Sequence, residues 1–273
     1  MNVDRKEALP PTVCGRHYLP DSLQSASARS AFPLEGRVAI VTGSAVRLGK
    51  ALALALAEQG ARLVIHYSAS AGPAEETVRH IKALGSDAMA IQADLSQCGE
   101  ARSIIEWAAT HFGQVDILVN SAAIFEPGNW DDTTEENWDR HFAINLKSPF
   151  FLSQAFATHV GRSRPGHIVN IADWRGVRPG TDHVAYTLTK AGLIAMTKSL
   201  ALALAPNIQV NAIAPGMILP PPGEDQAYLE QWAHQIPAQR VGSPGEIAKA
   251  LIFLLRSDFV TGELIFVTGG QHL

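Results

Sequence analysis

Cysteine is scarce in this sequence, which has only Cys14 and Cys98, far apart and without a CxxC pattern. Disulfide frameworks and cysteine zinc sites need more cysteines at short, regular spacings, so neither is expected. The ten histidines are scattered without the HExxH spacing of zinc hydrolases, and we expect no metal. This composition favours the reducing cytoplasm as the location.

The sequence also lacks a basic run and a long apolar run. The formal net charge is -4, so no charge pattern predicts a nucleic-acid footprint or a polybasic membrane patch. No segment approaches the roughly 20 apolar residues of a membrane span, because even Ala51–Ala57 is followed by Glu58 and Gln59. We expect a soluble protein that binds a small molecule, without a nucleic-acid or membrane partner.

The first 33 residues differ in composition from the rest of the 273-residue chain. They are rich in Ser, Ala and Pro and have no apolar segment of the kind found in signal peptides, so we expect a disordered tail over residues 1–33. Residues 34–273 contain no repeat and no linker, and α/β domains commonly reach about 250 residues. One domain is therefore predicted over 34–273.

Short apolar runs alternate with amphipathic runs along this domain. Strands are predicted at 38–41, 62–67, 87–92, 115–120, 167–172, 208–214 and 264–267. Helices are predicted between them, up to residue 60, at 75–84, 101–112 and 134–160, around Tyr186, and at 243–255. Such alternation predicts a doubly wound, Rossmann-like α/β fold, with a seven-stranded parallel sheet and helices on both faces. The proline-broken segment 216–240, helical only near 228–234, is predicted to cover a substrate.

Three polar residues are expected to converge at one end of this sheet. Tyr186 and Lys190 are four positions apart on a predicted helix, so their side chains leave the same face. Asp173 follows the apolar run 167–172, and open α/β sheets bind ligands at the carboxyl ends of such strands. A free phenol has a pKa of about 10, and a neighbouring ammonium lowers it toward working pH. The pattern favours proton transfer by Tyr186, although such a pair also occurs on solvated helix faces.

The first strand is followed by the turn TGSAVRLG, residues 42–49, and then by a helix. In this context Gly43 and Gly49 allow the backbone to approach a pyrophosphate, which the N–H groups at the helix start would hold. The second strand ends in His66, Tyr67, Ser68, Ala69 and Ser70, without the carboxylate that binds the ribose 2′-hydroxyl of NAD. Hydroxyls at Ser68 and Ser70, with His66 and Arg47, favour the 2′-phosphate of NADP(H).

With these motifs in place, the chain resembles the short-chain dehydrogenase/reductase family over residues 36–270. The other motifs that carry the resemblance are Asp94-Leu95 in QADLS, Asn120 and Ala122 after the fourth strand, Asn145 in FAINLKSPF, and Pro215-Gly216. The resemblance implies that Tyr186 is the proton donor or base and that Lys190 binds the nicotinamide ribose. It also implies that Asn145 holds a proton-relay water, that Asp94 contacts adenine, and that Leu48, Leu95, Asn120, Ala122, Pro215 and Gly216 line the cofactor. The same resemblance implies a homo-oligomer, a dimer or tetramer paired through the helices of Asn145 and Tyr186.

Three departures from the family pattern are similar to the pteridine reductase and dihydromonapterin reductase branch. Arg47 replaces the middle glycine of the first turn, Asp173 replaces the serine thirteen residues before the tyrosine, and Phe125 follows the fourth strand. A carboxylate beside a phenol disfavours phenolate, so Asp173 favours a tyrosine that acts as an acid in reduction. Asp173 would accept pterin N–H groups, Phe125 would stack on the ring, and Arg47 would reach pterin acceptors and cofactor phosphates.

The favoured hypothesis is an NADPH-dependent reductase of dihydropterins, with dihydrofolate as a further candidate substrate, in which Tyr186 and Asp173 deliver the proton. One alternative is a family member that reduces a simple carbonyl, such as a ketoacyl thioester, a sugar or a steroid. Another is a non-catalytic NADP-binding protein, suggested by the missing serine.

Overall fold

The computed structural model describes residues 34–221 and 223–273. The tail predicted at residues 1–33 lies outside the described residues. Among those described, no helix is long and apolar enough to cross a membrane.

Seven parallel strands form one sheet within the described part of the chain, as the alternation predicted. The strands are β1 (Val38–Val41), β2 (Arg62–Tyr67), β3 (Ala88–Gln92), β4 (Ile117–Asn120), β5 (Gly166–Ile171), β6 (Ile208–Pro215) and β7 (Leu264–Val267). Their spatial order is β3-β2-β1-β4-β5-β6-β7, so the direction of winding reverses between β1 and β4. In open α/β sheets the crevice at such a reversal is where ligands bind.

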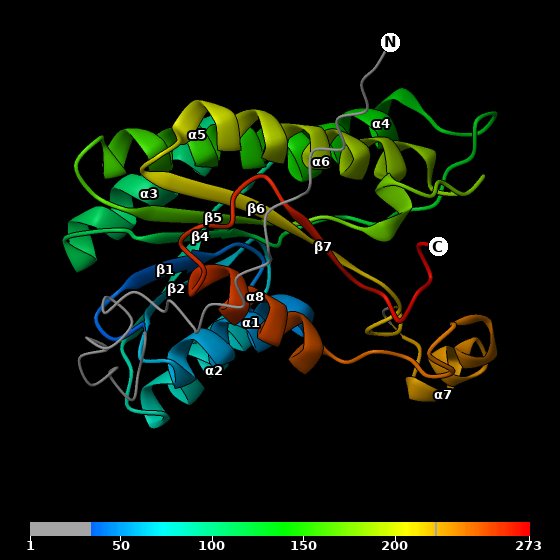
Figure 1. Cartoon of the computed structure of the whole chain (residues 1–273), viewed down its shortest axis with the longest axis horizontal. Coiled ribbons are helices and arrows are strands. Elements are labelled where there is room, and N and C mark those ends of the chain that lie inside the picture. The colour runs from blue at the N-terminus through cyan, green and yellow to red at the C-terminus, as the bar shows by residue number, and fades with distance from the viewer. Residues whose placement is uncertain (1–33, 222) are drawn as a thin grey trace, which may run out of the picture. The chain divides into compact units, whose positions relative to one another are not determined.

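Helices cover both faces of the sheet (Figure 1). One layer contains α3 (Cys98–Phe112), α4 (Glu135–Phe142), α5 (Ser148–Val160) and α6 (Val184–Leu204), and the other contains α1 (Arg47–Glu58), α2 (Ala71–Ala83) and α8 (Pro244–Leu255). The short helix α7 (Gln226–Glu230) stands apart from both layers in the segment 216–240, followed by a 3-10 turn at Ala233–Gln235. This segment therefore has little regular structure, as its prolines predicted.

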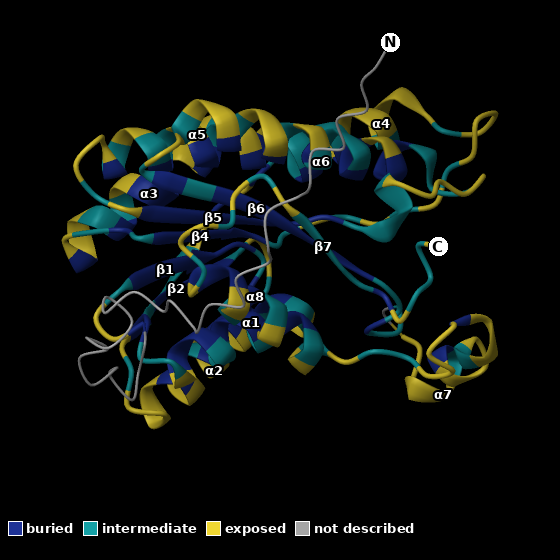
Figure 2. Cartoon of the chain, in the orientation of Figure 1, coloured by how far each residue is buried: buried dark blue, intermediate teal, exposed yellow. Residues whose placement is uncertain are grey.

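Strand side chains point alternately into two apolar layers. In β1, Val38 and Ile40 pack with the cluster that contains α3 and α5, whereas Ala39 and Val41 pack with the cluster that contains α1 and α8. The inner strands β1, β4 and β5 are buried along their length and dark blue in Figure 2, whereas the edge strands β3 and β7 are mostly of intermediate burial. A sheet buried on both sides explains why the strands are continuous apolar runs.

Two predicted helix starts were wrong, and one predicted helix is divided in the structure. Helix α2 begins at residue 71, four residues before the prediction, and α3 begins at residue 98, three residues before it. The helix predicted over 134–160 is divided by a π-helical turn at Ala143–Lys147. Pro149, in the first turn of α5, has no N–H to donate to the carbonyl of Asn145, which breaks the α-helical hydrogen-bond series there. The apolar periodicity of residues 134–160 is continuous and therefore did not predict the π turn.

We expect Leu56→Ala to destabilise the fold by about 2–5 kcal/mol, because removing a fully buried leucine leaves a cavity. Leu56 is 0% exposed in α1, whereas Leu202 in α6 is 85% exposed, so Leu202→Ala is the matched control and should change stability little. Urea denaturation of both variants measures the difference. Equal free energies of unfolding would contradict the assigned core.

Candidate active site

The crevice between β1 and β4 is closed at its base by the Thr42 side chain. Its hydroxyl oxygen accepts the backbone N–H groups of Ser121 (2.9 Å) and Ala122 (3.0 Å), and the hydroxyl donates to the Val119 carbonyl (3.4 Å). These bonds fix the segment after β4 against the turn after β1. The crevice predicted from the strand order is therefore built by specific contacts.

The turn after β1 depends on two glycines. Gly43 has a φ of 64°, and a Cβ there would lie 2.9 Å from the Ala122 Cα. A Cβ on Gly49 would lie 2.2 Å from the Gly43 carbonyl oxygen, so no side chain fits at either position. The N-cap residue of α1, Val46, provides no side-chain hydrogen bond, which leaves the first N–H groups of the helix for an anion. This turn fits a dinucleotide pyrophosphate.

Arg47 and Leu48 lie at the start of α1. Arg47 has a φ of 54°, and its guanidinium donates a hydrogen bond to the Pro220 carbonyl at 2.5 Å. The arginine thus joins the glycine turn to the segment 216–240, at the mouth of the crevice. Leu48 packs against the core, so its backbone, not its side chain, is the part that a cofactor would contact.

The structure corrects the role expected for His66. Its ring is 2% exposed, Nε2 lies 3.1 Å from the Ala93 carbonyl oxygen, and Nδ1 accepts the Gly43 N–H at 3.0 Å. Burial lowers the pKa of the imidazole, which favours the neutral form with the proton on Nε2. Because both nitrogens are bonded to backbone, His66 supports the glycine turn and does not reach a 2′-phosphate.

The neighbouring strand ends carry the other predicted cofactor residues. Ser68 is exposed and Ser70 half-buried at the end of β2, whereas Tyr67 packs partly into the core. After β3, the Asp94 carboxylate accepts the N–H (2.9 Å) and the hydroxyl (2.8 Å) of Ser96, and Leu95 is buried. The two serines and Asp94 lie on the adjacent strand ends where the adenosine half of a dinucleotide would bind.

Asn120 and Asn145 are both buried, and both are bonded to protein groups. Asn120 donates to Asn170 Oδ1 at 2.8 Å across β4 and β5, while its own Oδ1 has no hydrogen-bond partner within the described residues. Asn145, in the π turn, accepts the Ile124 N–H and donates to the Ile124 carbonyl, both at 2.9 Å. Asn145 therefore holds the backbone just before Phe125.

The structure brings Asp173, Tyr186 and Lys190 together as predicted. The Tyr186 hydroxyl donates to Asp173 Oδ2 at 2.7 Å, and Lys190 Nζ donates to the Ile171 carbonyl at 2.7 Å. Lys190 Nζ also lies 5.5 Å from the centre of the Tyr186 ring. Asp173 lies two residues after the end of β5, and the other two side chains leave one face of α6.

Burial dominates the titration of these three groups. Burial raises the pKa of Asp173, and burial together with the Asp173 charge raises the pKa of Tyr186 well above its usual value. Burial lowers the pKa of Lys190 to about 8, and the Asp173 charge opposes that shift. Tyr186 is therefore protonated at neutral pH, with its hydroxyl directed at the Asp173 carboxylate.

Phe125 forms an aromatic wall beside Tyr186. Its ring is 49% exposed, meets the Tyr186 ring edge-on at 4.7 Å between centroids, and stacks on the His183 ring at 4.0 Å and 2°. The sequence reasoning missed His183, as well as Arg175 and Asp182, whose side chains form an ion pair at 2.7 Å. No periodic pattern marks these loop residues.

At the far side of the crevice, Gly216 follows β6. Its N–H donates to the Val267 carbonyl at 3.0 Å, and a Cβ at this glycine would lie 2.4 Å from Gln271 Oε1. Pro215 is buried in β6. The backbone of these two residues therefore packs tightly against residues 267–271.

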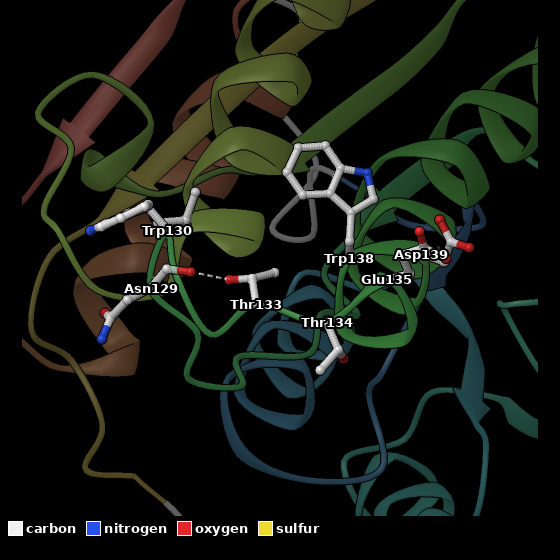
Figure 3. Close-up of a pocket in the computed structure, with 8 residues that line it drawn as sticks. Asn129, Trp130, Thr133, Thr134, Glu135, Trp138 and Asp139 are labelled. Atoms are coloured by element: carbon white, nitrogen blue, oxygen red, sulfur yellow. Dashed lines mark hydrogen bonds between the residues drawn. The ribbon is translucent and has the colours of Figure 1, made fainter.

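Two cavities lie near the strand ends. One, of about 600 Å³, is bordered by the residues after Asp173, by the α7 region and by the last residues of the chain, including Trp174, Arg175, Arg178, Tyr228, Trp232 and Gln271. The other, of about 670 Å³, lies between the loop after β4 and α4, where Trp130, Thr133 and Trp138 border it (Figure 3). The first cavity adjoins the end of β5 through Trp174 and Arg175, and neither cavity is lined by Asp173, Tyr186 or Lys190.

A doubly wound sheet, a glycine turn at its reversal point and a protonated tyrosine beside a lysine define a nicotinamide-dependent oxidoreductase. Comparison with known proteins gives the family. The model for enoyl-(acyl carrier protein) reductase matches residues 43–272, and the chain belongs to the short-chain dehydrogenase/reductase family. It is an NAD(P)-dependent reductase of that family, as the resemblance in the sequence predicted.

Its relatives differ in substrate. The 3-oxoacyl-(acyl-carrier-protein) reductase FabG of Staphylococcus aureus is 36% identical over 240 residues, which cover 86% of this chain and 98% of FabG. The structure of FolM alternative dihydrofolate reductase 1 from Brucella canis, complexed with NADP, matches with a TM-score of 0.83 and 34% identity, covering 88% of this chain and 95% of that one. The structure of a short-chain dehydrogenase from Burkholderia cenocepacia in complex with NADP matches with a TM-score of 0.82 and 33% identity. The match covers 88% of this chain and 99% of that one.

We predict that Asp173→Asn lowers the pKa of Tyr186, because the Asp173 charge and the hydrogen bond to its carboxylate both raise it. Absorbance of tyrosinate at alkaline pH measures the change when the titration of a Tyr186→Phe background is subtracted. Asp132→Asn, in the exposed loop after β4, is the control and should leave the Tyr186 titration unchanged. If the titration midpoint of Tyr186 is unchanged or higher in Asp173→Asn, Asp173 does not raise the pKa of Tyr186.

Proposed function

We propose that this chain is an NADPH-dependent reductase of dihydropterins, similar in kind to dihydromonapterin or dihydrobiopterin, with dihydrofolate as a further substrate. The observation that carries the proposal is the hydrogen bond from Tyr186 to Asp173, at the position where the family resemblance implies a serine. The similarity to FolM alternative dihydrofolate reductase supports the same substrate class.

The residues of the crevice fit NADPH. The glycine turn and the free N–H groups at the start of α1 suit the pyrophosphate, and Lys190 suits the nicotinamide ribose. Asp94, Leu95, Asn120, Ala122, Pro215 and Gly216 border the same strand ends. Ser68 and Ser70 suit the 2′-phosphate, since the end of β2 carries no acid. When bound there, NADPH would supply the hydride.

The chain's own residues account for the proton. Reduction of the carbon–nitrogen double bond of a dihydropterin needs hydride at carbon and a proton at nitrogen. Tyr186 Oη holds a proton that burial and Asp173 retain at neutral pH. The Lys190 ammonium, 5.5 Å from the ring, stabilises the phenolate left after transfer. The site therefore favours the reductive direction over alcohol oxidation.

Asp173 and Phe125 suit a flat ring with N–H donors. The Asp173 carboxylate accepts one bond at each oxygen, from the Arg175 N–H at 2.8 Å and from Tyr186, which leaves two of its about four acceptor positions for a pterin. Phe125 is half-exposed beside Tyr186 and offers an aromatic surface for stacking. Arg47, whose guanidinium donates to the Pro220 carbonyl, is the residue that we propose for the cofactor phosphates and pterin acceptors.

A ketoacyl reductase is the second candidate, because the chain is as similar to FabG as to FolM. Asp173 argues against it, since a carboxylate repels the oxyanion that forms on a reduced carbonyl oxygen. A non-catalytic NADP-binding protein is disfavoured by the assembled Tyr186, Lys190 and Asp173.

We also propose a homo-oligomer, a dimer or tetramer that pairs through α5, α6 and the π turn. These elements border an open cavity of about 740 Å³ with the apolar side chains Phe142, Leu146, Phe150 and Met196. Phe150 is 40% exposed, and Gly192 brings the backbone of α6 close to Leu146. Such an apolar face is typical of a subunit interface.

NADPH oxidation with dihydrobiopterin, dihydrofolate and a 3-ketoacyl thioester tests the function. We expect turnover of the dihydropterin, a loss of about 100-fold or more in Tyr186→Phe, and a larger loss of pterin reduction than of NADPH binding in Asp173→Ser. Turnover of the ketoacyl compound alone would reject the pterin proposal, and no turnover of any compound would favour the non-catalytic alternative.

We expect NADPH to bind at least about 10-fold more tightly than NADH, because hydrogen bonds to the charged 2′-phosphate contribute about 1.5–3 kcal/mol. Ser68→Ala and Ser70→Ala should weaken the binding of NADPH and leave the binding of NADH unchanged. Ser103→Ala, on the exposed face of α3, is the control. Fluorescence titration gives the dissociation constants, and equal values for the two cofactors would contradict the assignment.

A further inference from the structure

The loop over residues 174–183 joins the two residues that share the catalytic hydrogen bond. It begins directly after Asp173 with a short 3-10 turn, Trp174–Gly176, and ends where α6 begins at Val184, two residues before Tyr186. Any movement of one end of this loop relative to the other changes the distance between the Asp173 carboxylate and the Tyr186 hydroxyl. The position of both ends therefore matters to the reaction.

An ion pair closes the base of this loop. Arg175 Nη1 donates to Asp182 Oδ1 at 2.7 Å and Arg175 Nη2 donates to Asp182 Oδ2 at 3.2 Å, the two-bond geometry that a guanidinium makes with a carboxylate. The pKa of Asp182 is held well below its usual range, chiefly by this hydrogen bond. A Cβ on Gly180 would lie 2.7 Å from Asp182 Oδ1, so the tip of the loop folds closely over the pair.

Each partner of the ion pair is linked by further contacts to Asp173 or Tyr186. On one side, the Arg175 N–H donates to Asp173 Oδ1 at 2.8 Å. On the other side, His183 Nδ1 lies 2.8 Å from Asp182 Oδ2, and the His183 ring stacks on Phe125. Phe125 in turn meets the edge of Tyr186. A closed series of contacts thus surrounds the hydrogen bond between Asp173 and Tyr186.

The loop also has a fixed point on α6. A Cβ on Gly176 would lie 2.9 Å from the Lys190 carbonyl carbon and 3.0 Å from the Ala191 nitrogen, so the turn after Asp173 packs directly on the helix backbone. The other end of the loop is held by the ion pair and by the hydrogen bond from the Val184 N–H to the Gly128 carbonyl at 2.8 Å. Arg175 is 24% and Asp182 48% exposed at the side chain, whereas Tyr186 is 7% and Lys190 3% exposed.

We propose that Arg175 and Asp182 are positioning residues, whose two-bond ion pair holds the Asp173 carboxylate on the Tyr186 hydroxyl and the Phe125 wall against it. The proposal applies to any substrate that Tyr186 protonates. The charged groups that face the Tyr186 hydroxyl are Asp173, from the end of β5, Lys190, from α6, and Arg175, from the 3-10 turn.

A double-mutant cycle tests this role. Arg175→Ala and Asp182→Ala are each expected to lower kcat by about 10–100-fold, because small displacements of catalytic groups have effects of this size. The double variant should be no slower than either single variant, since both remove one shared contact. The rate is divided by the concentration of NADPH-binding sites, so that loss of folded protein does not lower the measured kcat. The NADPH dissociation constant should change less than about 2-fold.

Two further variants separate positioning from charge. Arg175→Lys keeps the positive charge but not the two-bond geometry, and it should remain near the rate of Arg175→Ala. Asp182→Glu keeps a carboxylate and should recover part of the rate. Lys50→Ala, which removes an ion pair of 2.9 Å with Glu76 between α1 and α2, is the control and should leave kcat unchanged.

A measurement without substrate completes the test. Release of Asp173 from Tyr186 in Asp182→Ala should lower the pKa of Tyr186, read from tyrosinate absorbance against a Tyr186→Phe background. An unchanged kcat in Asp182→Ala, additive effects in the double variant or full recovery in Arg175→Lys would overturn the proposal. A Tyr186 titration equal to that of the native protein would overturn it whichever substrate the enzyme reduces.

Discussion

The hydrogen bond between the Tyr186 phenol and the Asp173 carboxylate is the contact on which the rest of the site depends. It joins the end of β5 to one face of α6, so it exists only if the strand register and the helix position are both correct. Because the phenol is buried, losing this partner would leave a polar group without compensation. The bond therefore links the packing of the domain directly to the protonation state of the catalytic group.

The cofactor crevice shows the same reliance on close backbone contacts. Gly43, Gly49 and Gly216 each lie where a Cβ would overlap a neighbouring backbone or side chain, and Thr42 fixes the two strand ends on either side. His66 is buried and neutral, and its Nδ1 accepts a hydrogen bond from the Gly43 N–H in the glycine turn. Thr42 and His66 thus hold the glycine turn and the start of α1 in place through their contacts with the backbone.

The sequence predicted the strands and their parallel arrangement because burial on both faces gives continuous apolar runs. It also predicted that Asp173, Tyr186 and Lys190 meet, since helix spacing and strand ends are local properties. The π turn at Asn145 was missed because it leaves the apolar periodicity almost intact. The ion pair of Arg175 and Asp182 was missed because loop residues seven positions apart carry no periodic signal. His66 was misassigned because its burial depends on β3.

Asp173 combines two effects that a serine at this position would not. Its charge raises the pKa of Tyr186 and so keeps the proton on the phenol, and its carboxylate oxygens accept hydrogen bonds rather than donate them. A carbonyl oxygen that gains negative charge finds no donor there except Tyr186, whereas a ring N–H finds an acceptor. Burial raises the pKa of Asp173, and the hydrogen bonds from the Arg175 N–H and Tyr186 and the charge of Lys190 oppose that shift. The proposed preference for a pterin thus rests on the direction of the hydrogen bonds at Asp173.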